Sequence, residues 1–387
     1  MLLFASASGV SVANVYYAQP LLDALAADFS ISHAAIGGVV TATQVGCALA
    51  LMLLVPLGDL LERRQLMLVQ ALLLTTVLIF VGLAWSPAML LTSMLLTGVL
   101  GTAMTQGLIA YAASAASENE RGQVVGAAQG GVFLGLLLAR VLAGGISDVA
   151  GWRTVYFCSA VTMLMLAPLL WSGLPRLVTP QRRLSYLRLI GSMFLLLRHD
   201  RVLQIRGALA FLMFAAFNIF WSAMVLPLSA PPYSYSHTAI GAFGLVGAAG
   251  ALAAARAGRW ADQGHEHPTT FAALTLLLIA WIPLSLLHTS LWALVIGIVL
   301  LDLGGQAIHV TNQSMIFRSH PNGHSRVVGA YMLFYAAGSG LGALATTAVY
   351  AAIGWLGVSL LGAGVSLLAL IFWAATLRHI TVATSVK

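Results

Sequence analysis

The chain has 387 residues, of which 60% are hydrophobic and 7% charged, and its formal net charge is +7. Soluble domains carry about a quarter of charged residues, so this composition excludes an ordinary soluble protein and indicates one that crosses a membrane many times. Cys47 and Cys158 both fall in apolar stretches, which argues against a disulfide framework. Little sequence remains for a domain outside the membrane.

Apolar segments of about 20 residues, the length that spans a bilayer as a helix, follow one another along the chain. We place twelve spans at residues 3–26, 34–57, 66–85, 88–115, 123–147, 154–174, 204–228, 239–257, 270–288, 291–316, 327–350 and 355–377. With the N-terminus in the cytoplasm, sixteen of the 18 Lys and Arg residues, Arg206 among them, fall in inner loops and tails. This asymmetry predicts cytoplasmic termini and explains the basic charge without a nucleic-acid partner.

Short motifs recur in the same order in the two halves of the chain. The recurring pairs are Gly58–Glu62 with Gly258–Asp262, Val124–Ala127 with Val327–Ala330, Gly151–Trp152 with Gly354–Trp355, and Asn14–Tyr17 with Asn218–Trp221. We therefore expect an all-α polytopic membrane protein made of two pseudo-symmetric six-helix bundles, residues 1–174 and 204–387. A parallel repeat of this kind places the substrate site between the bundles, near the middle of the membrane.

The segment 175–203 joins the two bundles and is rich in arginine. Its apolar residues from Tyr186 to Leu197 recur at helical spacing, which predicts an amphipathic helix on the anionic membrane surface, with lipids as its partners. A solvated tether is the alternative interpretation.

Asp302 is the most informative single residue, because it lies near the middle of an apolar span. An acid at that depth costs at least about 2.5–3.5 kcal/mol, so such residues usually face the bundle interior and carry ions or substrate. Gln306, His309 and Gln313 follow at spacings that place all four side chains on one helical face. Imidazole titrates near neutral pH, so His309 is a candidate for proton handling.

Arg140 is the only comparably deep cation, and its depth allows a pair with Asp302 across the two halves. Such a pair would keep Asp302 ionised until substrate or a proton competes, and a static salt bridge is the alternative. Asp23 lies near the outer end of the first span, where a charge is inexpensive, and we expect no functional role for it.

Polar and aromatic residues interrupt several other spans. Those we expect to line a substrate cavity are Asn14, Tyr17, Gln19, Gln106, Asn218, Trp221, Gln306 and Gln313. Aromatic faces with few charges suit a neutral or partly apolar solute. Core packing and hydrogen bonding between helices are the alternative roles for each of them.

The loop GDLLERR resembles the signature loop of the major facilitator superfamily, with Gly58, Glu62 and Arg63 at the glycine, acid and arginine positions. The second copy keeps Gly258 and Asp262 but has glutamine where the family has arginine. The resemblance covers the whole chain and implies that these loops gate the transporter. Each acid would face the positive N-terminal end of a neighbouring helix, which is the span 327–350 for Glu62 and the span 123–147 for Asp262.

The fifth span, residues 123–147, is similar to the antiporter motif of proton-coupled drug exporters, but Ala139–Arg140 stands where that motif has glycine and proline. The resemblance implies a proton-coupled exporter of a drug-like or sugar-like solute in the bacterial inner membrane, working as a monomer. Proton-coupled uptake and uniport by the same fold stay open. The sequence has no hydrolase, zinc or nucleotide-binding motif and no channel filter, so we expect no enzyme, catalytic residue, metal or cofactor.

Overall fold

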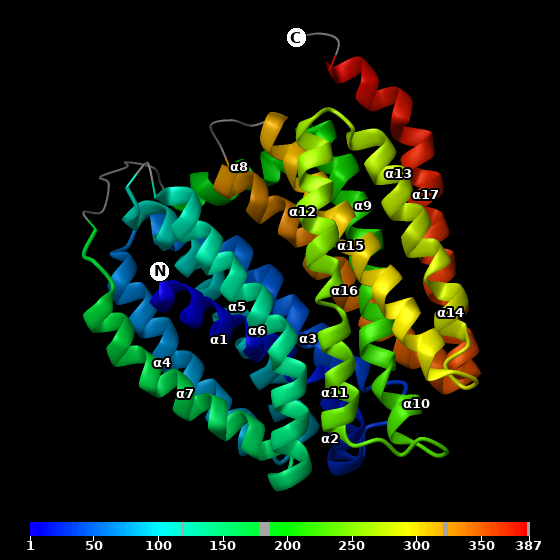
Figure 1. Cartoon of the computed structure of the whole chain (residues 1–387). Helices are drawn as coiled ribbons and strands as arrows, with labels where there is room; N and C mark the ends of the chain where they lie inside the picture. Colours follow the sequence, from blue (N-terminus) through cyan, green and yellow to red (C-terminus); the bar gives the residue numbers. More distant parts are fainter. Residues whose placement is uncertain (118–119, 178–185, 320–323, 385–387) are drawn as a thin grey trace. The chain divides into compact units, whose positions relative to one another are not determined.

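The computed structural model describes residues 1–117, 120–177, 186–319 and 324–384, and within them the chain forms helices and turns without a strand (Figure 1). The fold class expected from the sequence, an all-helical membrane protein, is confirmed. The chain forms two compact units: unit 1 is Met1–Gly191 with Val225–Leu245, and unit 2 is Ser192–Met224 with Val246–Lys387. The segment Val225–Leu245 thus packs in unit 1, although the chain on both sides of it belongs to unit 2.

Unit 1 is built from the first seven helices and from two that come later in the chain. Its elements are α1 Leu2–Tyr16, η1 Gln19–Leu21, α2 Leu22–Phe29, α3 Gly37–Leu49, η2 Ala50–Leu54, η3 Val55–Asp59, α4 Arg63–Gly82, α5 Pro87–Ala115, α6 Arg121–Ala150, α7 Trp152–Gly173, α10 Val225–Ser229 and α11 His237–Val246. α8, Tyr186–His199, lies in the segment where the sequence predicts an amphipathic helix, and the unit boundary falls within it.

Unit 2 contains the remaining helices. They are α9 Arg201–Ala223, α12 Ala249–Asp262, α13 Glu266–Ile279, α14 Trp281–Ser285, α15 Leu291–Ser319, α16 His324–Ile353 and α17 Trp355–Thr384. Two tryptophans hold this unit together by hydrogen bonds. The indole N–H of Trp281 donates to Ser366 at 3.0 Å and that of Trp355 to the carbonyl of Leu284 at 2.8 Å. Buried indoles need such acceptors.

Within the described residues, ten helical stretches are long and apolar enough to cross a membrane, and they coincide with the predicted spans other than the first and the eighth. The first span is continuous only to Tyr16, because Pro20 lacks the N–H that an α-helix requires, and the chain passes through η1 into α2. The eighth is divided into α11 and α12 at Gly247 and Ala248. Gly247 lies at this second break, and glycine is a poor helix former.

Glycines bring the central helices of each unit into close contact. A Cβ on Gly131 or Gly135 of α6 would overlap the backbone of Ala5 or Gly9 on α1. A second glycine pair in α16 meets the α9 backbone in the same way, at Phe211 and Ala215. Close helix packing in membranes depends on such small residues, and the repetition of the contact agrees with the sequence repeat.

Candidate functional site

Arg140 is a buried cation in the middle of α6, with 4% of its surface exposed. Its Nε and Nη2 atoms donate to the side-chain oxygen of Gln19 at 3.1 and 2.9 Å, and its guanidinium lies 5.7 Å from the Tyr16 ring centroid. A Cβ on Gly244 of α11 would lie 3.2 Å from Cδ of Arg140, so α11 covers the aliphatic stem. Of the residues predicted for transport, the structure therefore brings Arg140 and Gln19 together. A charge buried in apolar surroundings needs partners of this kind.

The other predicted cavity residues of unit 1 lie on α1, in the turn directly after it, and on α5. Asn14 is buried and accepts a hydrogen bond from Ser159 of α7 at 2.6 Å, so it links two helices. The Tyr17 ring packs edge-on against Tyr156 at 6.5 Å. Gln106 is half-buried on α5. These contacts give Asn14 and Tyr17 a packing role, and their part in a cavity stays a prediction.

The loop motif after η3 is organised by local hydrogen bonds. Glu62 caps α4, because its carboxylate accepts from the backbone N–H groups of Arg64 and Gln65 at 3.2 and 2.9 Å. Arg63 donates to the carbonyl of Gly58 and to that of Ala110 on α5, both at 2.8 Å. The motif therefore joins η3, α4 and α5. The expected helix partner of Glu62, α16, belongs to unit 2, so that part of the gating hypothesis stays a prediction.

Replacing Glu62 with alanine is expected to destabilise the protein by about 1 kcal/mol, because two N–H groups at the start of α4 lose their acceptor. Glutamine at this position keeps an acceptor oxygen and should retain most of the stability. Thermal unfolding of the purified protein measures the difference. Glu120→Ala is the matched control, because Glu120 occupies the same position before α6 without capping it. An equal loss in both alanine variants would contradict the capping role.

Asp302 lies in α15 and is buried, with 4% of its surface exposed. Gly250 of α12 packs directly over it: a Cβ there would lie 3.2 Å from Cβ of Asp302 and 2.9 Å from Cγ of Gln306. Asp302 and Gln306 therefore share the face of α15 that meets α12, as the helical spacing predicts. Asp302 belongs to unit 2 and Arg140 to unit 1, so their pairing stays a prediction.

His309 lies in an aromatic cluster of unit 2. Its Nδ1 is 3.1 Å from the hydroxyl of Tyr331 on α16, and its ring packs edge-on against Phe214 of α9 at 5.3 Å. Phe214 also meets Tyr335 of α16 at 4.3 Å. The sequence analysis did not single out these three aromatic residues. Gln313 follows one turn after His309 on α15 and is half-buried.

The remaining predicted residues of unit 2 lie on α9 and α12. Asn218 is buried and donates to the carbonyl of Phe214 at 3.2 Å. Trp221 is also buried, and its ring lies 5.1 Å from that of Phe220. A Cβ on Gly258 would lie 3.3 Å from Val310, so this glycine lets α12 approach α15. The side chain of Asp262 lies outside the part of the structure that is described.

Arg206 corrects one expectation from the sequence. It was assigned to an inner loop, but it lies within α9 and is fully buried, with 0% of its surface exposed. Its Nη1 donates to Thr270 at 3.2 Å and to Asn312 at 3.4 Å, and Asn312 returns a bond to the Arg206 carbonyl at 3.3 Å. Arg206 lies inside the predicted span 204–228, and that position was the available signal for its burial.

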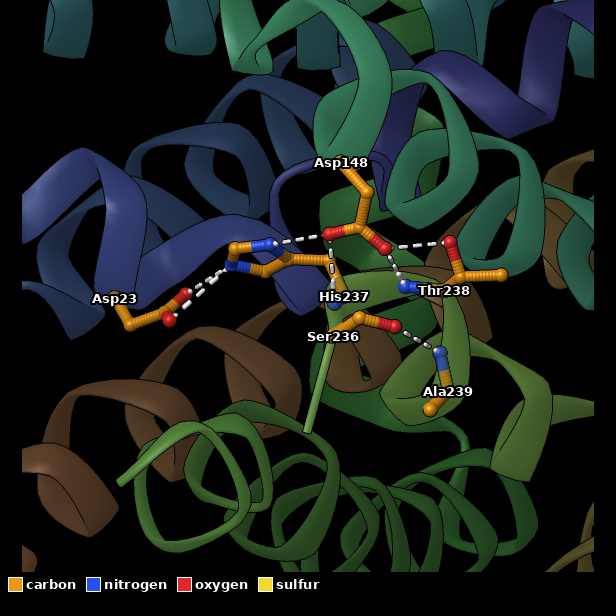
Figure 2. A network of polar contacts seen from close by, with 6 residues as sticks. All are labelled: Asp23, Asp148, Ser236, His237, Thr238 and Ala239. Carbon is orange, nitrogen blue, oxygen red and sulfur yellow. Dashed lines mark hydrogen bonds and ion pairs between the residues drawn. The ribbon is translucent and has the colours of Figure 1, made fainter. Parts of the chain in front are cut away.

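A polar network at one end of unit 1 joins Asp23 of α2, Asp148 of α6 and His237 with Thr238 of α11 (Figure 2). Asp23 was expected to have no function, and the other three were not considered. Each lies at or just beyond the end of a predicted span, and the topology assigns all of these ends to the outer face. The shared location of these polar residues at the outer ends of predicted spans was the sequence signal that could have indicated the network. Among the described residues, no group of three His, Cys, Asp or Glu could hold a metal ion.

The family model, the related sequences and the solved structures that match this chain all belong to membrane transporters. The sequence model of the Major Facilitator Superfamily matches residues 4–282 and 207–385. The uncharacterized transporter YgaY of Escherichia coli O157:H7 is 43% identical over 373 residues, covering 96% of this chain and 94% of that protein. Two solved structures share the fold at 14% identity. A bacterial homologue of the human lysosomal transporter Spinster has a TM-score of 0.78, with 97% and 96% of the two chains covered. The nucleoside transporter NupG has a TM-score of 0.75, with 97% and 100% covered.

Proposed function

The chain belongs to the Major Facilitator Superfamily and is a membrane transporter, and we propose that it exports a small organic solute in exchange for protons by alternating access. Asp302 carries this proposal, because it is an acid buried in a membrane-spanning helix beneath α12. Retaining an acid at such depth is costly, and proton relays are among the functions that such residues serve. Its neighbour on the same face, Gln306, offers a polar contact for the solute.

Arg140 and His309 complete the proposed coupling machinery. Arg140 supplies the only other deep charge of the predicted pathway, and its bonds to Gln19 join it to a predicted cavity residue. A cation that competes with a proton for Asp302 would favour the ionised carboxylate. His309 supplies the imidazole of the Phe214–Tyr335 cluster. Half-buried aromatic and amide side chains suit a drug-like, sugar-like or nucleoside-like solute.

The location that we propose is the bacterial inner membrane, with both termini in the cytoplasm, since inner loops and tails hold most of the arginines. We also propose a monomer in contact with membrane lipids. Ala139–Arg140 differs from the glycine and proline of the antiporter motif, so proton-coupled uptake is a second candidate function. α6 runs without interruption from Arg121 to Ala150, whereas a proline at position 140 would kink it.

Proton movement in reconstituted liposomes tests the proposal. Purified protein is reconstituted with a pH-sensitive dye inside the vesicles, and sugars, amino acids, nucleosides and lipophilic cations are added outside one at a time. An antiporter exchanges entering solute for protons, so the lumen becomes more alkaline, whereas a symporter acidifies it. Uptake of labelled solute with no change in luminal pH would identify a uniporter and overturn proton coupling. Protein-free vesicles are the control for passive leakage.

A further inference from the structure

The N-terminus of α11 is held in unit 1 by one carboxylate. Asp148, near the end of α6, accepts from the backbone N–H of His237 at 2.9 Å and from that of Thr238 at 2.8 Å (Figure 2). It also accepts from the Thr238 hydroxyl at 2.6 Å. The first N–H groups of a helix have no partner within the helix, and a negative charge there is favoured by the helix dipole. Asp148 therefore acts as a cap supplied from another helix.

The His237 side chain lies between two carboxylates. Its Nε2 is 3.0 and 3.2 Å from the two oxygens of Asp23, and its Nδ1 is 3.1 Å from an oxygen of Asp148. Neutral imidazole has one N–H and one lone pair, whereas imidazolium donates from both nitrogens. A neutral ring would therefore turn a lone pair toward one of the carboxylates. The geometry matches a protonated His237 that bridges α2 and α6.

Close helix packing accompanies this network. A Cβ on Gly144 of α6 would overlap the carbonyl of His237, and a Cβ on Gly241 would overlap the carbonyl of Arg140. α11 thus lies directly on α6, with backbone against backbone at two points one turn apart. The hydrogen bonds of Asp148 are located at the end of this contact.

We propose that Asp23, Asp148 and His237 form a proton-binding clasp that holds α11 on α6 and α2, and that loss of the proton releases α11. The ligand is a single proton on the His237 ring. Val225–Leu245 comes from the second sequence repeat but packs in unit 1, so its release would let a segment of that repeat move. The clasp lies on the outer side of the predicted topology, and it would act in the same way in an exporter and in an importer.

The direction of the pH effect follows from the surroundings of His237, which precedes the predicted span 239–257. The hydrogen bond to Asp23 raises the pKa of His237 above its ordinary value, and the charges of Asp23 and Asp148 act in the same direction against the opposing effect of burial. These two carboxylates are the charged groups that the described neighbouring helices place against the ring. The clasp is therefore fully formed below the ordinary histidine pKa, and it is lost as the pH rises through the raised pKa.

Hydrogen exchange of the α11 N-terminus measures the clasp directly, because its two first N–H groups donate to Asp148. Full-length protein in nanodiscs is compared between about pH 5 and pH 9, with rates corrected for the intrinsic effect of pH. We expect protection of His237 and Thr238 to fall as the pH rises through the raised pKa of His237, because loss of the ring proton removes the bridge between the two carboxylates. His237→Gln should lack this pH dependence, and Asp148→Ala should lose protection at every pH.

Two variants serve as matched controls. Asp28→Asn removes a carboxylate from the same helix as Asp23, but Asp28 pairs with Arg153 and not with His237. His33→Gln removes an exposed histidine from the loop that follows this helix. Both should keep the wild-type pH dependence. Exchange of the α3 and α5 amides checks that each variant is folded. Wild-type protection that does not change with pH, or an unchanged pH dependence in His237→Gln, would overturn the proposal.

Discussion

Asp302→Asn is expected to reduce solute-triggered proton movement to the level of protein-free vesicles. Asparagine has nearly the shape of aspartate and can occupy the same place beneath Gly250, but it neither binds nor releases a proton. The substitution therefore removes the negative charge of Asp302 without leaving a cavity in its place. The measurement is the luminal pH change in the liposome experiment, with the solute that gives the largest signal for the wild type.

A second assay separates loss of coupling from loss of the protein. Exchange of labelled for unlabelled solute across the membrane needs the cavity and the conformational change but no net proton transfer. We expect Asp302→Asn to retain exchange and Asp302→Glu to retain both exchange and proton movement, since glutamate restores the carboxyl group. If proton movement in Asp302→Asn equals that of the wild type, Asp302 has a structural role only and the coupling hypothesis is wrong.

The membrane-spanning helices were largely predictable, because apolar length and arginine asymmetry are local properties of the sequence. The same reasoning placed Asp302 and Gln306 on one face of α15, and the contact of both with Gly250 agrees with that placement. The division of the first span was not predicted, although the sequence contains Pro20. A count of apolar residues does not take account of the N–H group that proline lacks.

The polar contacts were harder to predict, because their partners are distant in sequence. His237 lies 89 residues from Asp148 and 214 from Asp23. A single sequence offers no means of pairing residues over such intervals. The buried state of Arg206 depends in the same way on Thr270 and Asn312. Glu62 caps its own helix, a local role that its position just before α4 could have predicted.

Gly131→Leu is expected to destabilise the protein by at least about 3 kcal/mol, the upper part of the range for overpacking. At this position α6 touches α1 backbone to backbone, so a side chain would overlap the Ala5 main chain, which cannot move aside as a flexible side chain can. Separating the helices would also break the contact of Gly135 with Gly9 one turn further on. We expect a lower unfolding temperature, or loss of the monodisperse protein, in detergent.

Gly130 provides the matched control, because it precedes Gly131 in the same helix and a Cβ there would meet nothing within 4 Å. Gly130→Leu should therefore leave stability unchanged or raise it by up to about 1 kcal/mol, the helix-propensity difference between the two residues. The two variants add the same side chain at adjacent positions, so composition and helix propensity cancel in the comparison. Only contact with α1 distinguishes them. Equal unfolding temperatures would mean that α1 and α6 separate readily, and that this glycine contact does not hold unit 1 together.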